Sequence, residues 1–367
     1  MPASRAASAD SDLIEELTVV DTEVHTAETA DVLMEYIEDD KQRELQQSGY
    51  PIGPDSWGPI PWDGWDRSAG GRIDWDNFVV PSAEEYDEKR REFGIDKVVF
   101  SPGAGFKIFQ IPNERTRATF MRAMNNFTVD KYALGDGTYY GKILGVPELP
   151  QETAAEIERY GDHDGIVAVF MTALGPEYPL GHEMYHPIYE AAEKYDLPIV
   201  LHGESSMYPS FPTGGLNMAN FVEVHTLCHP FLQAWHAVSV IAQGIPERFD
   251  IDWGFWEAGQ SWIQMIKNRM DREYVERPND LPDLTKLPSE YMSDFYYATQ
   301  PLEEPAKPEH LGQILAMNDI EDQLCLSTDW PHMDFDSPSS VVDHEGLSRE
   351  QKTKILQDNG LEFFDLA

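Results

Sequence analysis

Apolar, β-branched runs alternate with segments of helical periodicity along most of the chain. Such runs are apolar almost throughout, which is typical of parallel strands covered by helices on both faces. The pattern predicts strands at 17–22, 96–101, 141–147, 165–173, 197–203, 250–257, 293–299 and 323–329. It predicts helices at 29–48, 82–93, 113–131, 152–161, 183–195, 230–243, 260–275, 308–317 and 348–360.

The regular alternation of strand and helix decides the fold class. Eight such units favour a closed (β/α)8 TIM barrel, with an open doubly wound sheet as the alternative. We expect residues 1–14 to form a flexible tail and residues 15–367 to form a single barrel domain. No glycine-rich loop follows the first predicted strand, which disfavours a dinucleotide-binding protein.

One segment interrupts this alternation after the first predicted helix. Residues 50–81 are rich in Gly, Pro and Trp and show no sustained period. An insertion of this length exceeds a plain connection and is expected to have a role of its own. Packing over one end of the barrel, enclosing the substrate and contributing to a homodimer are the alternatives. Its tryptophans are Trp57, Trp62, Trp65 and Trp75.

Charge is the most unusual feature of the composition. The chain has 27 basic and 66 acidic side chains, a formal net charge of −39. This balance excludes a general nucleic-acid binder and disfavours anionic membranes. The carboxylates are spread along the chain, so a salt-adapted, halophilic surface is expected. No apolar run approaches the roughly 20 residues that span a bilayer, and a cytoplasmic protein is expected. Cys228 and Cys325 are expected to be buried, inert thiols.

Ionisable residues recur where predicted strands end. Glu23 and His25 are two residues apart at the first strand, and His202 closes the fifth. Glu257 follows the sixth strand and Asp329 the eighth. Each alone has a structural explanation, such as a core histidine with satisfied hydrogen bonds. In a barrel, however, the carboxyl ends of all strands meet at one mouth, where a TIM barrel carries its chemistry. Carboxylates and imidazoles there suit one divalent ion, Zn²⁺ first and Mn²⁺ next.

Several longer stretches carry a family resemblance. From about residue 17 onward the chain resembles the amidohydrolase superfamily, in its branch related to aminocarboxymuconate-semialdehyde decarboxylase. That resemblance implies a metal-dependent TIM-barrel enzyme, either a carboxy-lyase or a hydrolase. The stretches that carry it are 245–274, 293–305, 324–338 and 355–366.

The resemblance assigns metal ligands residue by residue. Glu23 and His25 correspond to the Glu-x-His variant of the family's usual His-x-His motif, a variant seen among its aromatic-acid decarboxylases. His202 and Asp329 match the metal histidine of strand five and the aspartate of strand eight. Glu257 stands where the family has a catalytic histidine on strand six, which puts the mechanism that uses this histidine in doubt.

The resemblance also bears on the number of ions and on neighbouring residues. Two-metal members of the superfamily use a carbamylated lysine on strand four, and residues 164–174 contain no lysine. A single ion is therefore expected. His229 either approaches the site or only begins a helix. His332 either orients Asp329 or stabilises its loop.

Three functions remain open at this stage. The first is decarboxylation of an aromatic or unsaturated carboxylic acid, with Asp329 delivering a proton to carbon and Glu257 orienting the substrate or handling a proton. The second is hydrolysis of an ester, lactone or amide, with Asp329 as general base for a metal-bound water. The third is a binding protein without catalytic activity, which the set of ionisable groups disfavours. Lys107 and Arg115 are candidate cations for a substrate carboxylate.

Overall fold

The computed structural model describes most of the chain after residue 81 and a shorter part before it. The predicted insertion at 50–81 and Lys107 lie outside the described residues, as does most of the predicted tail. Helix α1 begins at Leu13, within the last two residues of that tail. The described residues are 10, 12–26, 28, 30–39, 82–103, 108–109, 111–203, 221–281, 283–303, 305–332 and 335–366.

Eight parallel strands form one sheet in the order β1 to β8. Two backbone hydrogen bonds close the ring, from Thr22 N to Leu326 O (2.9 Å) and from His25 N to Trp330 O (2.7 Å). The predicted (β/α)8 barrel is therefore confirmed. The strands are β1 (Val20–His25), β2 (Lys97–Ser101), β3 (Tyr139–Leu144), β4 (Ile166–Thr172), β5 (Ile199–His202), β6 (Trp253–Trp256), β7 (Tyr296–Ala298) and β8 (Leu324–Cys325).

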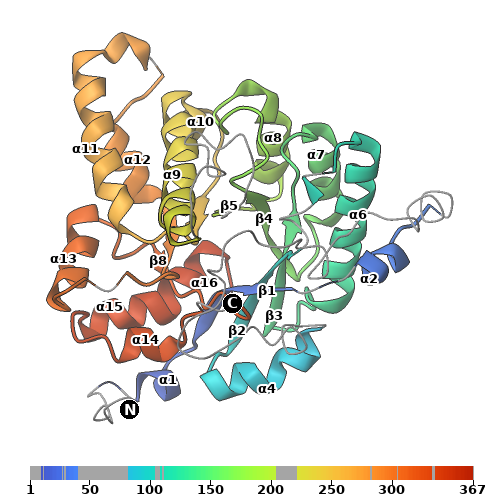
Figure 1. Cartoon of the computed structure of the whole chain (residues 1–367), viewed down its shortest axis with the longest axis horizontal. Helices are drawn as coiled ribbons and strands as arrows, with labels where there is room; N and C mark the ends of the chain where they lie inside the picture. The colour runs from blue at the N-terminus through green and yellow to red at the C-terminus, as the bar shows by residue number, and fades with distance from the viewer. Residues whose placement is uncertain are drawn as a thin grey trace.

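Helices surround the ring of strands and bury its outer face (Figure 1). Every residue of the eight strands is buried, which explains their continuous apolar character. The helices are α1 (Leu13–Glu16), α2 (Ala30–Glu35), α4 (Ala83–Phe93), α6 (Glu114–Lys131), α7 (Pro150–Tyr160), η3 (Glu183–Tyr185), α8 (His186–Lys194), α9 (Phe221–Ala242), α10 (Ile245–Arg248), α11 (Ser261–Glu276), η5 (Pro278–Asp280), α12 (Pro288–Asp294), α13 (Glu309–Asn318), α14 (Pro338–Val342), α15 (Arg349–Thr353), η6 (Lys354–Asp358) and α16 (Asn359–Phe363).

Several predicted boundaries were wrong; within the predicted helix 29–48, for example, α2 ends at Glu35. The first strand lies at Val20–His25, later than predicted, so its metal-binding candidates belong to the strand itself. Residues 293–294 form the end of α12 and not the start of β7. Helix α9 begins at Phe221, upstream of Pro230, where we had expected it to start. Proline favours a first helical turn, but inside a helix it removes only one backbone hydrogen bond, and tertiary contacts can outweigh that loss.

Such tertiary contacts join α9 to the ends of three strands, β4, β5 and β6. His229 Nδ1 donates to Glu257 O (2.9 Å), just past β6. Gln233 Nε2 donates to Leu201 O (2.9 Å) in β5 and to Trp256 O (2.8 Å) in β6. His236 Nε2 donates to Ala173 O (2.8 Å), after β4. The three side chains are four and three residues apart, so one face of α9 fixes this side of the barrel mouth.

His236 gives a prediction for the pH dependence of stability. Burial lowers the pKa of this histidine from 6.5 to about 4. Below about pH 6.5 the unfolded chain therefore binds a proton at this histidine, whereas the folded chain does not. The free energy of unfolding consequently decreases as the pH is lowered. Between pH 7 and pH 5 this group should cost about 2 kcal/mol of unfolding free energy. Urea unfolding of the wild type and of His236→Gln at both pH values checks this: the loss should be smaller by that amount in the variant. Equal losses would refute it.

Within the described ranges, none of the helices is both long enough and apolar enough to cross a membrane.

Candidate metal centre

A β-bulge in β1 sets the geometry of the first two candidate ligands. Val20 and Asp21 pair with Lys97 and Val98, but the next paired residue, Val24, is opposite Phe100, so two residues of β1 oppose one of β2. Such a bulge changes the alternation of side chains between the two faces of a sheet, and bulges are common beside active sites. It places Glu23, within the bulge, at the mouth of the barrel.

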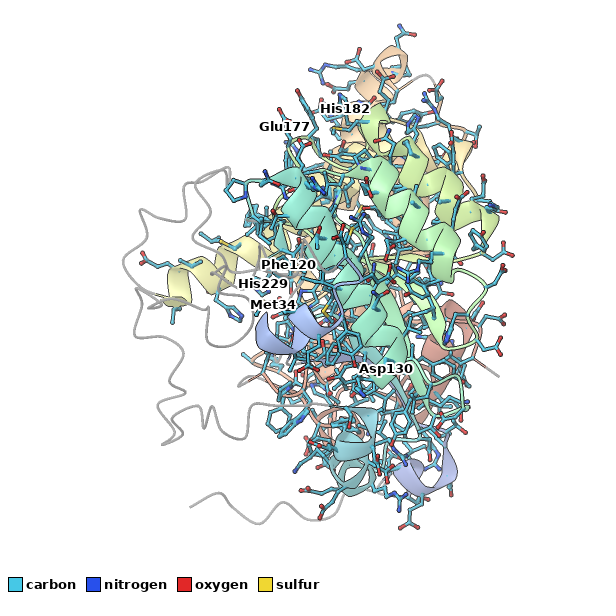
Figure 2. The ribbon with its side chains drawn as sticks, turned by 90° about the vertical axis from the view of Figure 1, so that its right-hand side faces the viewer. Met34, Phe120, Asp130, Glu177, His182 and His229 are labelled. Carbon is cyan, nitrogen blue, oxygen red and sulfur yellow. The ribbon has the colours of Figure 1, made fainter. Side chains whose placement is uncertain are left out.

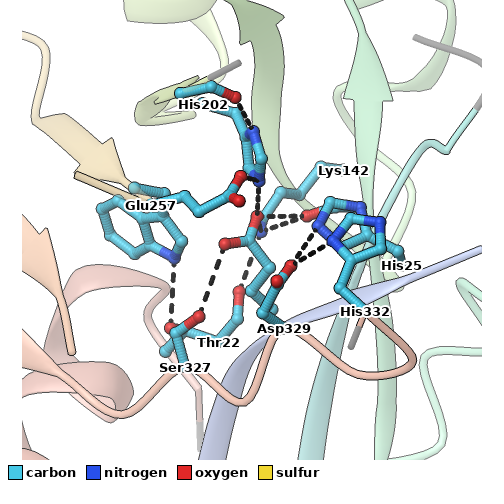
Figure 3. Close-up of polar contacts among 12 residues, drawn as sticks. Thr22, His25, Lys142, His202, Glu257, Ser327, Asp329 and His332 are labelled. Carbon is cyan, nitrogen blue, oxygen red and sulfur yellow. Dashed lines mark hydrogen bonds and ion pairs between the residues drawn. The ribbon is translucent and has the colours of Figure 1, made fainter. Parts of the chain in front are cut away.

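The structure brings the four predicted ligands together from strands β1 and β5 and the segment after β8. Figure 3 shows His25, His202 and Asp329 converging there. Each of the four offers one ligand atom, and these atoms all lie within 4.8 Å of one another. His202 Nε2 lies 3.4 Å from Glu23 Oε1, and His25 Nε2 lies 2.8 Å from Asp329 Oδ1. All four side chains are buried. Two carboxylates and two imidazoles supply two negative charges, which match one divalent cation.

The orientation of His202 fits a metal ligand. Its Nδ1 donates to Gly203 O (2.5 Å), so a neutral ring carries its lone pair on Nε2. That nitrogen faces Glu23 Oε1 and also lies 2.9 Å from Glu257 Oε2. A lone pair next to two carboxylate oxygens is unfavourable unless a cation is shared among them. A backbone carbonyl that orients a histidine in this way is usual around protein-bound metals.

Asp329 is held in a strained and buried position. Its φ is 59°, in the left-handed region that costs an ordinary residue about 1–2 kcal/mol. Its Oδ1 contacts both His25 Nε2 and His332 Nδ1, each at 2.8 Å. Its Oδ2 is buried and has no hydrogen-bond partner among the described residues. A buried carboxylate oxygen in this state fits the coordination of a cation, so the residues present are suited to hold one.

Glu257 and His229 lie beside the four ligands. Glu257 also has a positive φ, 55°, directly after β6. Its Oε1 lies 3.5 Å from His229 Nδ1, while its Oε2 contacts His202. Burial lowers the pKa of His229 well below its usual value and does the same to that of His25, so both rings are neutral at pH 7. The two residues whose roles the sequence left open thus adjoin the centre.

Comparison with models of protein families identifies the family of the chain. The family model described as Amidohydrolase matches residues 21–366. This chain belongs to the amidohydrolase family. The resemblance seen in the sequence is thereby confirmed over nearly the full length. No curated protein matches this amidohydrolase in a sequence search.

Solved structures resemble this amidohydrolase throughout its fold. An amidohydrolase from Mycobacterium avium subsp. paratuberculosis shares 16% identity, with a TM-score of 0.73 over 95% of this chain and 99% of that one. 5-Carboxyvanillate decarboxylase from Novosphingobium aromaticivorans, complexed with manganese and 4-hydroxy-3-methoxy-5-nitrobenzoic acid, shares 17% (TM-score 0.68; 96% and 97% covered). 2,6-Dihydroxybenzoate decarboxylase from Rhizobium shares 16% (TM-score 0.68; 95% and 99%). At these identities the likeness shows a shared fold.

The sequence analysis missed a buried lysine below the centre of this amidohydrolase. Lys142 Nζ donates to Thr22 O (2.8 Å) and Ser101 Oγ (2.7 Å), and it lies 3.8 Å from Glu23 Oε1. Ser101 Oγ in turn donates to Glu23 Oε1 (3.0 Å). Burial lowers the pKa of Lys142 to about 8, and Glu23 opposes this shift. A lysine inside an otherwise apolar predicted strand was the available signal, because a buried ammonium needs a partner.

Replacing Lys142 should therefore destabilise the metal-free protein. Lys142→Met leaves Glu23 in the interior without its cation, and removal of one partner from a buried pair costs about 3–5 kcal/mol. Urea unfolding at pH 7 in the presence of a chelator measures the change. Lys194→Met is the control, because Lys194 pairs with Glu158 at an exposed position, where a loss within about 0.5 kcal/mol is expected. Equal stability of the two variants would show that Lys142 does not support Glu23.

Two further residues that could meet a substrate, Arg115 and Phe335, are among the described residues. Arg115 is exposed in the first turn of α6. The ring of Phe335 packs against Trp330 (centroids 4.9 Å apart) and Phe93 (5.9 Å). These contacts stabilise the loop that carries Asp329 and His332.

Proposed function

We propose that this amidohydrolase catalyses the metal-dependent, non-oxidative decarboxylation of an aromatic carboxylic acid that carries an oxygen substituent next to the carboxylate. The observation that carries the proposal is the position of Asp329, which adjoins the metal-binding candidates and keeps one oxygen without a hydrogen bond among the described residues. Two of the structural neighbours are decarboxylases of hydroxylated benzoic acids, and one of them is complexed with manganese.

The ligand set assigns the first role. Glu23, His25, His202 and Asp329 would hold one divalent ion, with Zn²⁺ and Mn²⁺ as the two candidates. When bound, this ion would supply positive charge that offsets the charge of the substrate carboxylate. Asp329 would then be the carboxyl group next to the ring carbon that bears this carboxylate.

Asp329 carries the proton step. The proton that reaches the ring carbon bearing the carboxylate passes through the Asp329 carboxyl group. The bond between this carbon and the carboxylate then breaks, and CO₂ leaves. No oxidant or reductant takes part in the reaction. His332 contacts Asp329 Oδ1 and holds the carboxyl group in place, and it is the adjacent group that can return a proton after each turnover. Glu257, beside His202, orients the substrate at the opposite side.

Product analysis tests the proposal directly. Protein loaded with Mn²⁺ or with Zn²⁺ is incubated in concentrated salt, which suits its acidic surface, with a panel of ortho-hydroxybenzoates and with a panel of esters and lactones. CO₂ release together with the decarboxylated arene supports the proposal. Acid release from esters without CO₂ would favour hydrolysis, with Asp329 as general base. Absence of CO₂ release from every acid with fully metal-loaded protein would refute it.

A further inference from the structure

A second cluster of metal-binding side chains lies next to the first. His225 and His229 are four residues apart in α9, so both lie on one face of the helix. Their ring centroids are 4.7 Å apart. Together with Glu257 they offer three ligand atoms that all lie within 4.8 Å of one another. Two ligands of one ion with bonds of about 2.0–2.3 Å lie at most about 4.6 Å apart, so this upper limit is close to the range that one ion can hold.

We propose that His225, His229 and Glu257 bind a second divalent cation, with Zn²⁺ as the preferred ion. Two histidines one helical turn apart with a carboxylate from elsewhere are a common zinc ligand set that leaves a fourth position open. The site needs no bridging lysine, so the absence of lysine from β4 does not exclude it. The prediction of a single ion considered only the lysine-bridged arrangement.

The backbone holds this cluster in place. His229 Nδ1 donates to Glu257 O (2.9 Å), and an outer hydrogen bond of this kind is usual for a histidine ligand. Gly203 makes the close approach possible, because a Cβ there would lie 2.4 Å from Glu257 O and 3.1 Å from the His229 ring. Figure 2 shows α9, with His229 labelled on it, projecting from the body of the described chain. The end of β6 thus fixes the position of His229 relative to Glu257.

Glu257 is the carboxylate that connects the two clusters, and it is buried at the same mouth as Glu23 and Asp329. Its two oxygens face different histidines: Oε2 lies 2.9 Å from His202 Nε2, and Oε1 lies 3.5 Å from His229 Nδ1. Glu257 therefore stands between the two clusters. The net charge of −39 raises the concentration of divalent cations around the whole molecule.

Metal counting tests the proposal without any assay of activity. The full chain is stripped with a chelator, reloaded with Zn²⁺ and desalted, and zinc per chain is measured by mass spectrometry. Two ions per chain are expected in the wild type and one in His225→Ala. His310→Ala, which removes an exposed histidine of α13, is the matched control and should keep two. Circular dichroism verifies folding, and His225→Gln replaces the alanine variant if that variant does not fold.

Each outcome decides the question. A fall from two ions to one in a folded His225 variant supports the second site. One ion in the wild type, or two in a folded His225 variant, overturns it. The count does not depend on the reaction, so failure of the decarboxylation assay would leave this result intact, and the converse holds as well.

Discussion

Asp329→Asn is expected to lower kcat for decarboxylation by about 10³-fold, because an amide cannot give the proton that the ring carbon must receive. The substitution keeps the size of the side chain, so the fold should persist. A smaller rise in KM is expected, since asparagine is a weaker ligand than aspartate. Steady-state kinetics with the best substrate of the hydroxybenzoate panel, at saturating metal, measures both constants.

The control for this variant removes a carboxylate elsewhere. Asp322→Asn, at an exposed position paired with Lys354, should keep the wild-type kcat. Circular dichroism and urea unfolding establish that both variants are folded. Full activity in Asp329→Asn with bound metal would exclude Asp329 as the proton donor and would leave the chemistry to Glu257 or His229.

Removal of the metal is expected to abolish turnover and to weaken the fold. Without a cation, the carboxylates of Glu23 and Asp329 and the rings of His25 and His202 stay buried close together. An ion that binds only the folded state adds about 2.7 kcal/mol of stability at a hundred times its Kd. Urea unfolding after chelation, and again after addition of Zn²⁺ or Mn²⁺, measures this gain. The ion that restores both stability and turnover is the functional one.

Magnesium provides the comparison for this experiment. Mg²⁺ prefers six oxygen ligands, so it should restore little at a site with two imidazoles. Undiminished turnover in protein whose metal content is far below one ion per chain would contradict a role for metal in the reaction.

The architecture followed from local pattern. Apolar runs such as those of β4 and β5 have no polar face, and only a sheet covered on both sides can bury them. Their regular alternation with amphipathic helices leaves few arrangements of the chain. For the same reason the sequence alone predicts that residues at the carboxyl ends of strands, including His202 and Asp329, lie at one mouth of the barrel.

Three features of the site did not follow from pattern. The bulge in β1, the continuation of α9 across Pro230 and the burial of Lys142 each depend on contacts between distant segments. Local preference argues against each of them: a bulge breaks the ladder, a proline removes a helical hydrogen bond, and a lysine prefers water. These three features persist because tertiary hydrogen bonds and ion pairs stabilise the fold by more than the unfavourable local preferences destabilise it.

The sequence by itself determined the barrel, its strand order and the identity of the residues that lie at its mouth. Hydrophobic periodicity is a local property that identifies the strands, and in a barrel of parallel strands the carboxyl end of every strand lies at the same mouth. Only the tertiary structure decided how these groups face one another. Glu257 between His202 and His229, and Asp329 between His25 and His332, are contacts across the barrel mouth, and their ångström-scale distances depend on packing that no local pattern encodes.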